Sequence, residues 1–199
     1  MNKKMSYGIA TLMVALLLSG CGKVPQAEID LANAAIDSAR LAGADIYLPE
    51  AFAAVQDSMK SALILSEGQT SRLIKNYGEV KDKLAQVSEQ AEEVRLQTEA
   101  RKEELRTQIQ AIVADVKSLL EENLQLITQA PKGKEGTAAL MSIKSELDVI
   151  AATVTEVEMM TGEGDLLACQ SKIIAAKEKA ASIKDELTEV ISKYNKARR

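Results

Sequence analysis

The pattern of apolar and polar positions divides the chain into one short apolar run and a series of helical segments. Residues 9–18 are apolar with the single exception of Thr11. From about residue 28 onward, apolar residues instead recur at alternating steps of three and four, which places them on one face of an α-helix. The pattern predicts an all-α fold in which antiparallel helical hairpins are joined by a long coiled-coil-like helix.

The first hairpin is expected to contain one helix over 28–42 and a second that starts near Glu50. Gly43 suits the C-cap of the first helix, and Pro49 suits the first turn of the second. Residues 43–49 are therefore interpreted as the connection. The apolar faces that follow the helical spacing are Ile29, Ala32, Ile36, Ala39 and Gly43 on the first helix and Phe52, Val55, Met59 and Ala62 on the second.

A long helix over 79–129 is expected after a bend at 76–78. Each glycine costs about 1 kcal/mol inside a helix, so Gly78 favours a break there, and Gly68 is a second interruption. One continuous helix is the alternative. The charged stretch 88–108 is expected to be a solvated shaft rather than a binding patch. The apolar heptad is Leu73, Tyr77, Val80, Leu84, Val87, Ala91 and Val94, and it resumes as Leu105, Ile109, Ile112, Val116 and Leu119.

Two further helices are predicted to form a C-terminal antiparallel hairpin. Residues 130–136 break the long helix, and 161–164 form a turn before Asp165, which suits an N-cap. Helices joined by so short a turn pack antiparallel. The seams are Leu140, Ile143, Leu147, Ile150, Val154 and Val157 on one helix and Leu166, Cys169, Ile173, Ala176, Ala180, Ile183, Leu187, Val190 and Tyr194 on the other.

The residues on either side of the apolar run near the start predict a bacterial lipoprotein signal. Lys3 and Lys4 precede it, and Leu18-Ser19-Gly20-Cys21 follows it. A basic start, a short apolar region and small residues before the cleavage site define a secretory signal, while ten apolar residues are too few for a bilayer, which needs about 20. We expect cleavage between Gly20 and Cys21 and lipidation of the Cys21 thiol. A transmembrane anchor or a buried helix is the competing interpretation.

Composition excludes several classes of function. Removal of residues 1–20 leaves 179 of the 199 residues, with 23 Lys+Arg against 29 Asp+Glu, a formal charge of −6. An acidic chain is a poor ligand for nucleic acid. The sequence has no His, the most common general acid or base, and no cluster of metal ligands, phosphate loop or calcium loop. We therefore expect no enzyme activity, no metal, no cofactor and no small-molecule substrate.

Cys169 has no partner for a disulfide within the chain once Cys21 carries lipid. An intermolecular disulfide is possible in an oxidising compartment. Because Cys169 lies on the apolar seam of the last helix, a buried structural thiol is the favoured interpretation.

Residues 28–95 resemble a family of bacterial helical lipoproteins whose domain has no assigned function. The resemblance is carried by Ala32, Ala35, Ile36, Ala39 and Ala42, followed by Gly43-Ala44, Tyr47 and Pro49-Glu50. In this family, similar Ala steps precede a Gly-Ala…Tyr-x-Pro corner and a second helix. The resemblance implies an Ala-packed helical hairpin and no activity.

Together these features predict four segments: a signal at 1–20, a lipidated tether at 21–27, an N-terminal hairpin and long helix at 28–129, and a C-terminal hairpin at 137–196. Gly22 in place of Asp after the lipidated residue favours the periplasmic face of the outer membrane, or the cell membrane in an organism that lacks an outer one. The expected function is a periplasmic scaffold or adaptor for unidentified envelope proteins, possibly as a homo-oligomer. The alternative is a holdase-like chaperone module.

Overall fold

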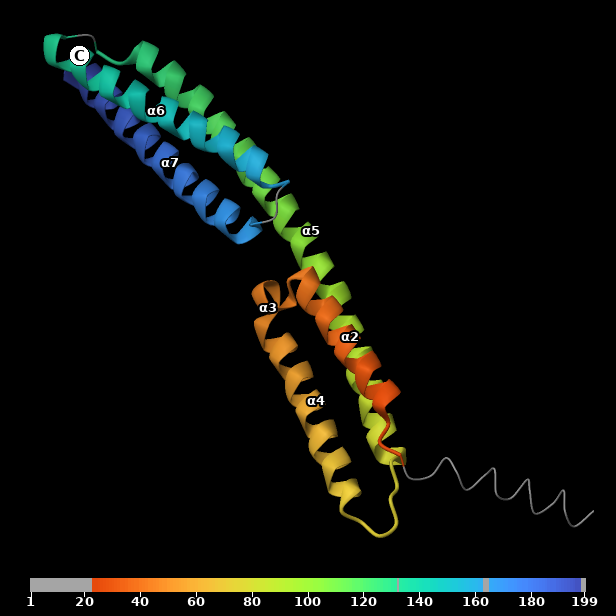
Figure 1. The fold of residues 1–199 in the computed structure, drawn as a ribbon. Coiled ribbons are helices and arrows are strands. Elements are labelled where there is room, and N and C mark those ends of the chain that lie inside the picture. Colours follow the sequence, from red (N-terminus) through yellow and green to blue (C-terminus); the bar gives the residue numbers. More distant parts are fainter. Residues whose placement is uncertain (1–22, 132, 163–164, 198–199) are drawn as a thin grey trace, which may run out of the picture. The chain divides into compact units, whose positions relative to one another are not determined.

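The protein is all-α. The computed structural model describes residues 23–131, 133–162 and 165–197, and this part of the chain contains no strand. Its helices are α2 (Gln26–Ala42), α3 (Ala44–Tyr47), α4 (Pro49–Thr70), α5 (Gly78–Gln129), α6 (Lys134–Met160) and α7 (Leu166–Ala197), as labelled in Figure 1. Two compact units divide inside α5, between Arg101 and Lys102.

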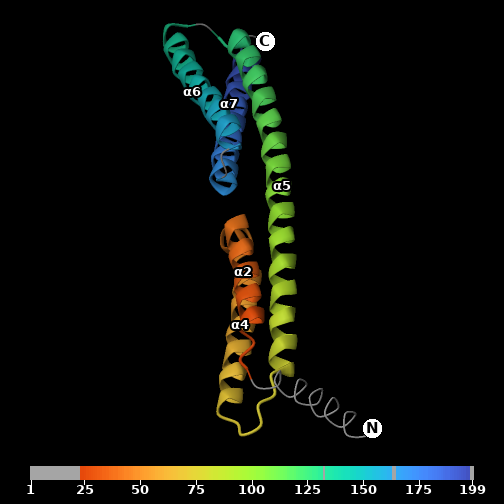
Figure 2. The same cartoon turned by 45° about the vertical axis from the view of Figure 1, so that its right-hand side comes forward.

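The first unit is built from α2, α4 and the first part of α5. Figures 1 and 2 show α2 and α4 as a hairpin beside the yellow part of α5. Small side chains on α2 allow the helices to approach closely, while larger ones on α4 and α5 fill the space between them. The shared core consists of Ala32, Ile36, Ala39, Ala44, Phe52, Val55, Met59, Ala62, Tyr77, Val80, Leu84, Val87, Ala91 and Val94.

The corner of this hairpin confirms the predicted cap. Gly43 has φ of +94°, a left-handed conformation that favours glycine, and its N–H donates to the Arg40 carbonyl at 2.8 Å. A Cβ at this position would lie 3.1 Å from the Tyr47 ring. The one-turn helix α3 occupies most of the predicted connection, and Pro49 is in the first turn of α4 as expected.

The predicted bend before the long helix is confirmed, and the continuous helix is excluded. The Asn76 side chain accepts a hydrogen bond from the Gly78 N–H at 3.0 Å, and α5 begins there. The prediction that Leu73 starts the seam is wrong, because α4 ends at Thr70 and Leu73 lies in the loop 71–77, fully exposed. Gly68 does not interrupt α4.

The second unit contains the rest of α5 with α6 and α7. Three polar pairs join α5 to α7, each with a separation of 62 residues: Gln108–Gln170 at 3.0 Å, Asp115–Lys177 at 2.6 Å and Glu122–Lys184 at 2.6 Å. Successive pairs are seven residues apart on both helices, so α5 and α7 run parallel in one heptad register. Across the antiparallel pair of α6 and α7, Glu146 binds Lys179 at 3.2 Å and Glu156 binds Lys172.

The antiparallel hairpin of α6 and α7 is confirmed, with α5 as a third partner. Asp165 caps α7 as predicted, because its carboxylate accepts from the Ala168 N–H at 3.0 Å. The hairpin begins at Lys134, earlier than the predicted residue 137. The compact units divide at 101–102 instead of at the 130–136 break, because the second half of α5 packs on α7.

Two details of the predicted seams are wrong. Val113 is buried in place of Ile112, which is only partly buried. An uncoiled helix drifts against a seven-residue repeat, so steps of four from Leu105 to Ile109 and on to Val113 keep one face toward the core. At the end of α7, Val190 and Tyr194 are 43% and 41% exposed. With a separation of 62 residues between facing positions, Tyr194 would face a position after Gln129, where α5 has already ended.

Candidate functional site

The predicted lipidation site lies outside the described residues. Gly20 and Cys21 both precede Lys23, where the described chain begins. Lys23 leads directly into α2, whose first turn is joined to the first turn of α5 by an ion pair between Glu28 and Lys81 at 2.5 Å. An anchor at Cys21 would therefore attach at the end of the first unit where α2 and α5 begin.

A hollow of about 480 Å³ opens at this end of the first unit. Residues 23–28 form one wall, and Asn76, Tyr77, Gly78 and Lys81 form the other. Tyr77 is buried, and its hydroxyl has no hydrogen-bond partner in the described structure. The tether and the loop before α5 are thus neighbours in space although about 50 residues separate them.

Cys169 is fully buried in the core of the second unit, in agreement with the predicted structural thiol. It stands in the first turn of α7, where its N–H donates to the Asp165 carbonyl at 3.0 Å. A thiol that solvent does not reach is a poor candidate for redox exchange or metal binding.

Metal-binding side chains do not cluster in the described part of the chain. No group of three or more His, Cys, Asp or Glu residues among 23–131, 133–162 and 165–197 lies close enough together to hold a metal ion. The Ser and Thr hydroxyls donate mainly to backbone carbonyls in the preceding turn of their own helices, such as Ser88 to Leu84 at 3.0 Å and Thr153 to Val149 at 3.0 Å.

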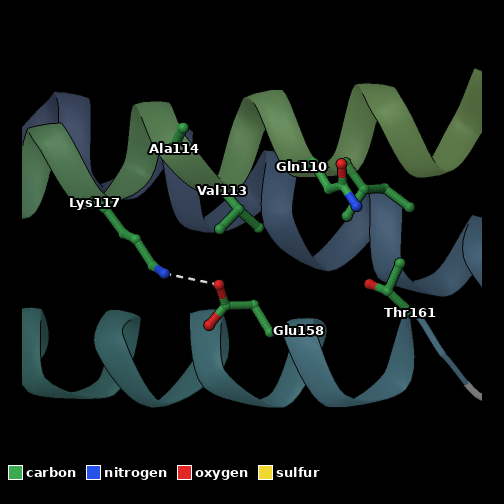
Figure 3. A pocket seen from close by; sticks show the side chains of 7 residues that line it. Gln110, Val113, Ala114, Lys117, Glu158 and Thr161 are labelled. Atoms are coloured by element: carbon green, nitrogen blue, oxygen red, sulfur yellow. Dashed lines mark hydrogen bonds and ion pairs between the residues drawn. The ribbon is translucent and has the colours of Figure 1, made fainter.

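An open hollow lies between α5 and α6 in the second unit (Figure 3). It measures about 350 Å³, and Ile109, Val113 and Ala114 supply its apolar floor. Lys117 and Glu158 reach across it and form an ion pair at 2.7 Å, as Figure 3 shows. A second hollow, of about 260 Å³, continues along the same two helices and is lined by Ile127, Thr128, Thr137, Leu140, Met141 and Lys144. We call these two hollows together the α5–α6 groove.

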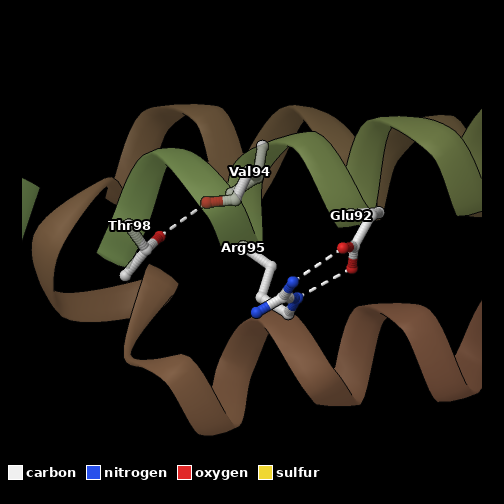
Figure 4. A network of polar contacts seen from close by, with 4 residues as sticks. All are labelled: Glu92, Val94, Arg95 and Thr98. Carbon is white, nitrogen blue, oxygen red and sulfur yellow. Dashed lines mark hydrogen bonds and ion pairs between the residues drawn. The ribbon is translucent and has the colours of Figure 1, made fainter. Parts of the chain in front are cut away.

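The charged stretch 88–108 behaves as a solvated helix surface along much of its length. In Figure 4 the Arg95 guanidinium forks onto the Glu92 carboxylate of the same helix through two hydrogen bonds of 2.7 Å. Thr98 is an exception, since it is fully buried and its hydroxyl donates to the Val94 carbonyl at 2.7 Å. Ion pairs within one helix at the surface hold the helix but contribute little to stability.

The pKa shifts in the structure arise from ion pairs at the helix surface. A hydrogen bond from Lys184 lowers the pKa of Glu122, and the same bond raises the pKa of Lys184. A hydrogen bond from Lys81 lowers the pKa of Glu28 in the same way. These shifts favour the charged forms at neutral pH, so they describe structural ion pairs and not a poised acid or base.

The sequence pattern did not predict two features of the structure, one buried and one exposed. Asn123 is fully buried in the second unit and donates to the Ala180 carbonyl at 2.8 Å. Its position four residues after Leu119 continues the predicted seam and could have indicated this. The exposed Leu73-Ile74 pair was also missed, since Leu73 was assigned to the seam.

Comparison with known proteins gives no relative: no family model, no curated protein and no solved structure matches the chain. The resemblance of residues 28–95 to helical lipoproteins therefore stays a prediction. Within the described residues, no helix combines the length and the apolar character that crossing a membrane requires.

Proposed function

We propose that the protein is a non-enzymatic, lipid-anchored envelope protein that serves as a periplasmic scaffold or adaptor. The anchor is Cys21, exposed by removal of residues 1–20, and the location is the periplasmic face of the outer membrane. The proposal rests on the lipoprotein signal in the sequence and on two helical units that offer surfaces for binding other proteins.

The observation that carries the adaptor proposal is the α5–α6 groove. The long apolar seams are largely used inside the chain, since Leu105, Ile109 and Val116 on α5 are buried. They are therefore not free to pair with a partner over their whole length. The groove is lined by apolar side chains, with the Lys117–Glu158 ion pair across one of its hollows and Lys144 in the lining of the other. An apolar face of an amphipathic helix from another envelope protein is the chemistry that such a groove accepts.

Crosslinking in living cells tests this proposal. A photoreactive residue at Gln110 or Ala114 lies in the groove, and one at Glu89 lies on the exposed side of α5 in the first unit. We expect a discrete heterologous adduct at the two groove positions and none at Glu89. Equal labelling at all three positions, or no adduct in the groove, would contradict the adaptor proposal.

The same experiment separates the alternatives. Adducts only to a second copy of the chain would indicate a homo-oligomeric structural role. Adducts to many unrelated outer-membrane proteins would favour a holdase, which should also protect a denatured outer-membrane protein from aggregation at stoichiometric amounts.

A further inference from the structure

The loop between α4 and α5 exposes two large apolar side chains. Leu73 is 106% exposed and Ile74 is 87% exposed, so neither contributes to the core. Arg72 and Lys75 flank them directly, and the loop 71–77 contains no acidic residue. Folding removes neither side chain from water, so both are available for an apolar contact outside the chain.

Hydrogen bonds fix both ends of this loop. The Arg72 N–H donates to the Gln69 carbonyl at 3.2 Å, and the Gln69 side chain accepts from the Asn76 N–H at 3.3 Å. Asn76 in turn caps the start of α5. These hydrogen bonds join the two ends of the loop, so Leu73 and Ile74 lie at the tip of an ordered loop and not in a frayed helix end.

The loop lies at the end of the unit that carries the tether. Residues 23–28 and 76–78 line opposite walls of one hollow. In Figures 1 and 2 the yellow loop and the beginning of α2 are at the same end of the hairpin. Lys23 is only two residues after Cys21, a reach of about 7 Å when extended. A lipid on Cys21 would therefore hold this end of the unit at the bilayer surface.

The charge of this end matches an anionic bilayer. Within the loop, Arg72 and Lys75 are cations without an acidic neighbour, and Lys23 adds a third. Glu28 is paired with Lys81, and Glu67 and Glu79 flank the loop on α4 and α5, so this end keeps a small positive excess in a chain of net charge −4. Apolar side chains flanked by basic ones are the composition of segments that enter the boundary between headgroups and acyl chains.

We propose that Arg72-Leu73-Ile74-Lys75 is a second membrane contact, in which Leu73 and Ile74 enter the bilayer surface and the two cations bind anionic headgroups. This inference rests on the proposed lipid anchor, which brings the loop to the membrane. Two attachment points would orient the first unit relative to the bilayer, which a single flexible lipid tether cannot do.

Tryptophan fluorescence tests the insertion directly, because the natural chain has no Trp. Leu73→Trp places the probe in the loop, and Leu41→Trp places it at the other end of α2, where Leu41 is 90% exposed. Each lipidated variant is reconstituted into phosphatidylethanolamine–phosphatidylglycerol vesicles with or without brominated acyl chains. We expect a shift of emission to shorter wavelength and quenching by bromine for Trp at 73 and neither effect at 41. Emission at 73 that is unshifted and unquenched would overturn the proposal.

Charge substitutions test the headgroup contact without the lipid. In the chain that starts at residue 21 with Cys21→Ser, each of Arg72→Gln and Lys75→Gln should weaken binding to the anionic vesicles about fivefold. Lys60→Gln, the same charge change on the exposed side of α4, is the control and should leave binding unchanged. Equal effects of all three substitutions would contradict a specific contact.

The mass of the reconstituted protein shows whether Cys21 carries lipid, so failure of the proposed function can be told from failure of the loop contact. A chain without lipid at Cys21 would end the lipoprotein proposal and remove the anchor on which the loop contact rests. A lipidated chain with a solvated Trp at 73 would end only the loop proposal.

Discussion

At the scale of single residues, Asn123 and Cys169 are buried side chains in the described part of the second unit that can form polar interactions. Cys169 behaves as a small apolar residue, which its place on a regular seam predicted. Asn123 is different, because its amide donates to Ala180 while its side-chain oxygen is buried without a partner. A buried Asn at such a position fixes the register of neighbouring helices at a cost in stability. The Asn123 bond to Ala180 lies beside the Glu122–Lys184 ion pair that also joins α5 to α7.

Replacement of Asn123 with Leu should stabilise the second unit. The substitution removes an unpaired buried oxygen and adds apolar burial, so we expect the free energy of unfolding to rise by about 1 kcal/mol. Urea denaturation followed by circular dichroism measures this change. Asn123→Asp, which buries a charge, should lower the free energy of unfolding instead. A loss of stability in the Leu variant would show that the Asn123 side chain is fully satisfied.

The burial of Cys169 predicts a slow thiol. In the chain that starts at residue 21 with Cys21→Ser, modification of Cys169 by DTNB requires local or global opening. Typical folding free energies then make the reaction at least about 1000-fold slower than that of an exposed thiol. Leu41→Cys in the same chain supplies the exposed reference. Immediate modification of Cys169 in native buffer would contradict its burial.

At the scale of elements, local signals set where helices start and stop. Gly43, Pro49 and Asp165 marked their boundaries correctly because each acts through its own backbone conformation or cap. The loop 71–77 could not be placed in the same way. Leu73 has the correct spacing to extend the heptad, but α4 ends at Thr70 and α5 begins only at Gly78. The hydrogen bond from Asn76 to Gln69 that closes this gap forms only in the folded chain.

Two glycines should respond in opposite directions to alanine. Gly43→Ala adds a Cβ at a positive φ and close to Tyr47, so we expect a loss of about 1–2 kcal/mol in stability. Gly68→Ala lies within α4, and a Cβ there meets nothing within 4 Å. It should gain up to about 1 kcal/mol from helix propensity. Thermal unfolding of both variants measures the two changes in midpoint temperature. Equal changes in the two variants would contradict the assigned conformations.

The ion pair between α5 and α7 predicts a pH dependence of stability. Lys184 lowers the pKa of Glu122, so the contribution of the pair is present above pH 4.5, the ordinary value for Glu, and is lost as pH falls through the lowered pKa. The same pair raises the pKa of Lys184, so its contribution to stability is lost at the alkaline end only when pH rises through the raised pKa of Lys184. The stability difference between wild type and Glu122→Gln should therefore be constant near neutrality and shrink below pH 4.5. Glu121→Gln is the control, and a difference that grows in acid would contradict the assignment.

At the scale of the whole molecule, periodicity predicted the helical class and most of the buried residues. Ala32, Ala39 and Leu84, for example, are buried as their spacing indicated. Periodicity did not predict the division inside α5, because a seam shows which face is buried but not which helix covers it. It also could not separate Ile112 from Val113, since the choice depends on how far the helix departs from a seven-residue repeat.

At this scale the proposed function depends most on the proposed anchor. The helical units supply the α5–α6 groove and the loop 71–77, but each acts at the envelope only if the chain is held there. Signal cleavage and lipidation at Cys21 are therefore the central claim.

Intact mass spectrometry of the protein purified from the membrane fraction tests that claim most directly. We predict a chain of 179 residues that begins at Cys21 and is heavier than its polypeptide by a diacylglycerol and an amide-linked acyl group, while Cys21→Ala prevents both cleavage and lipid addition. A wild-type chain that retains residues 1–20, or that begins at Cys21 with no added lipid, would contradict the account.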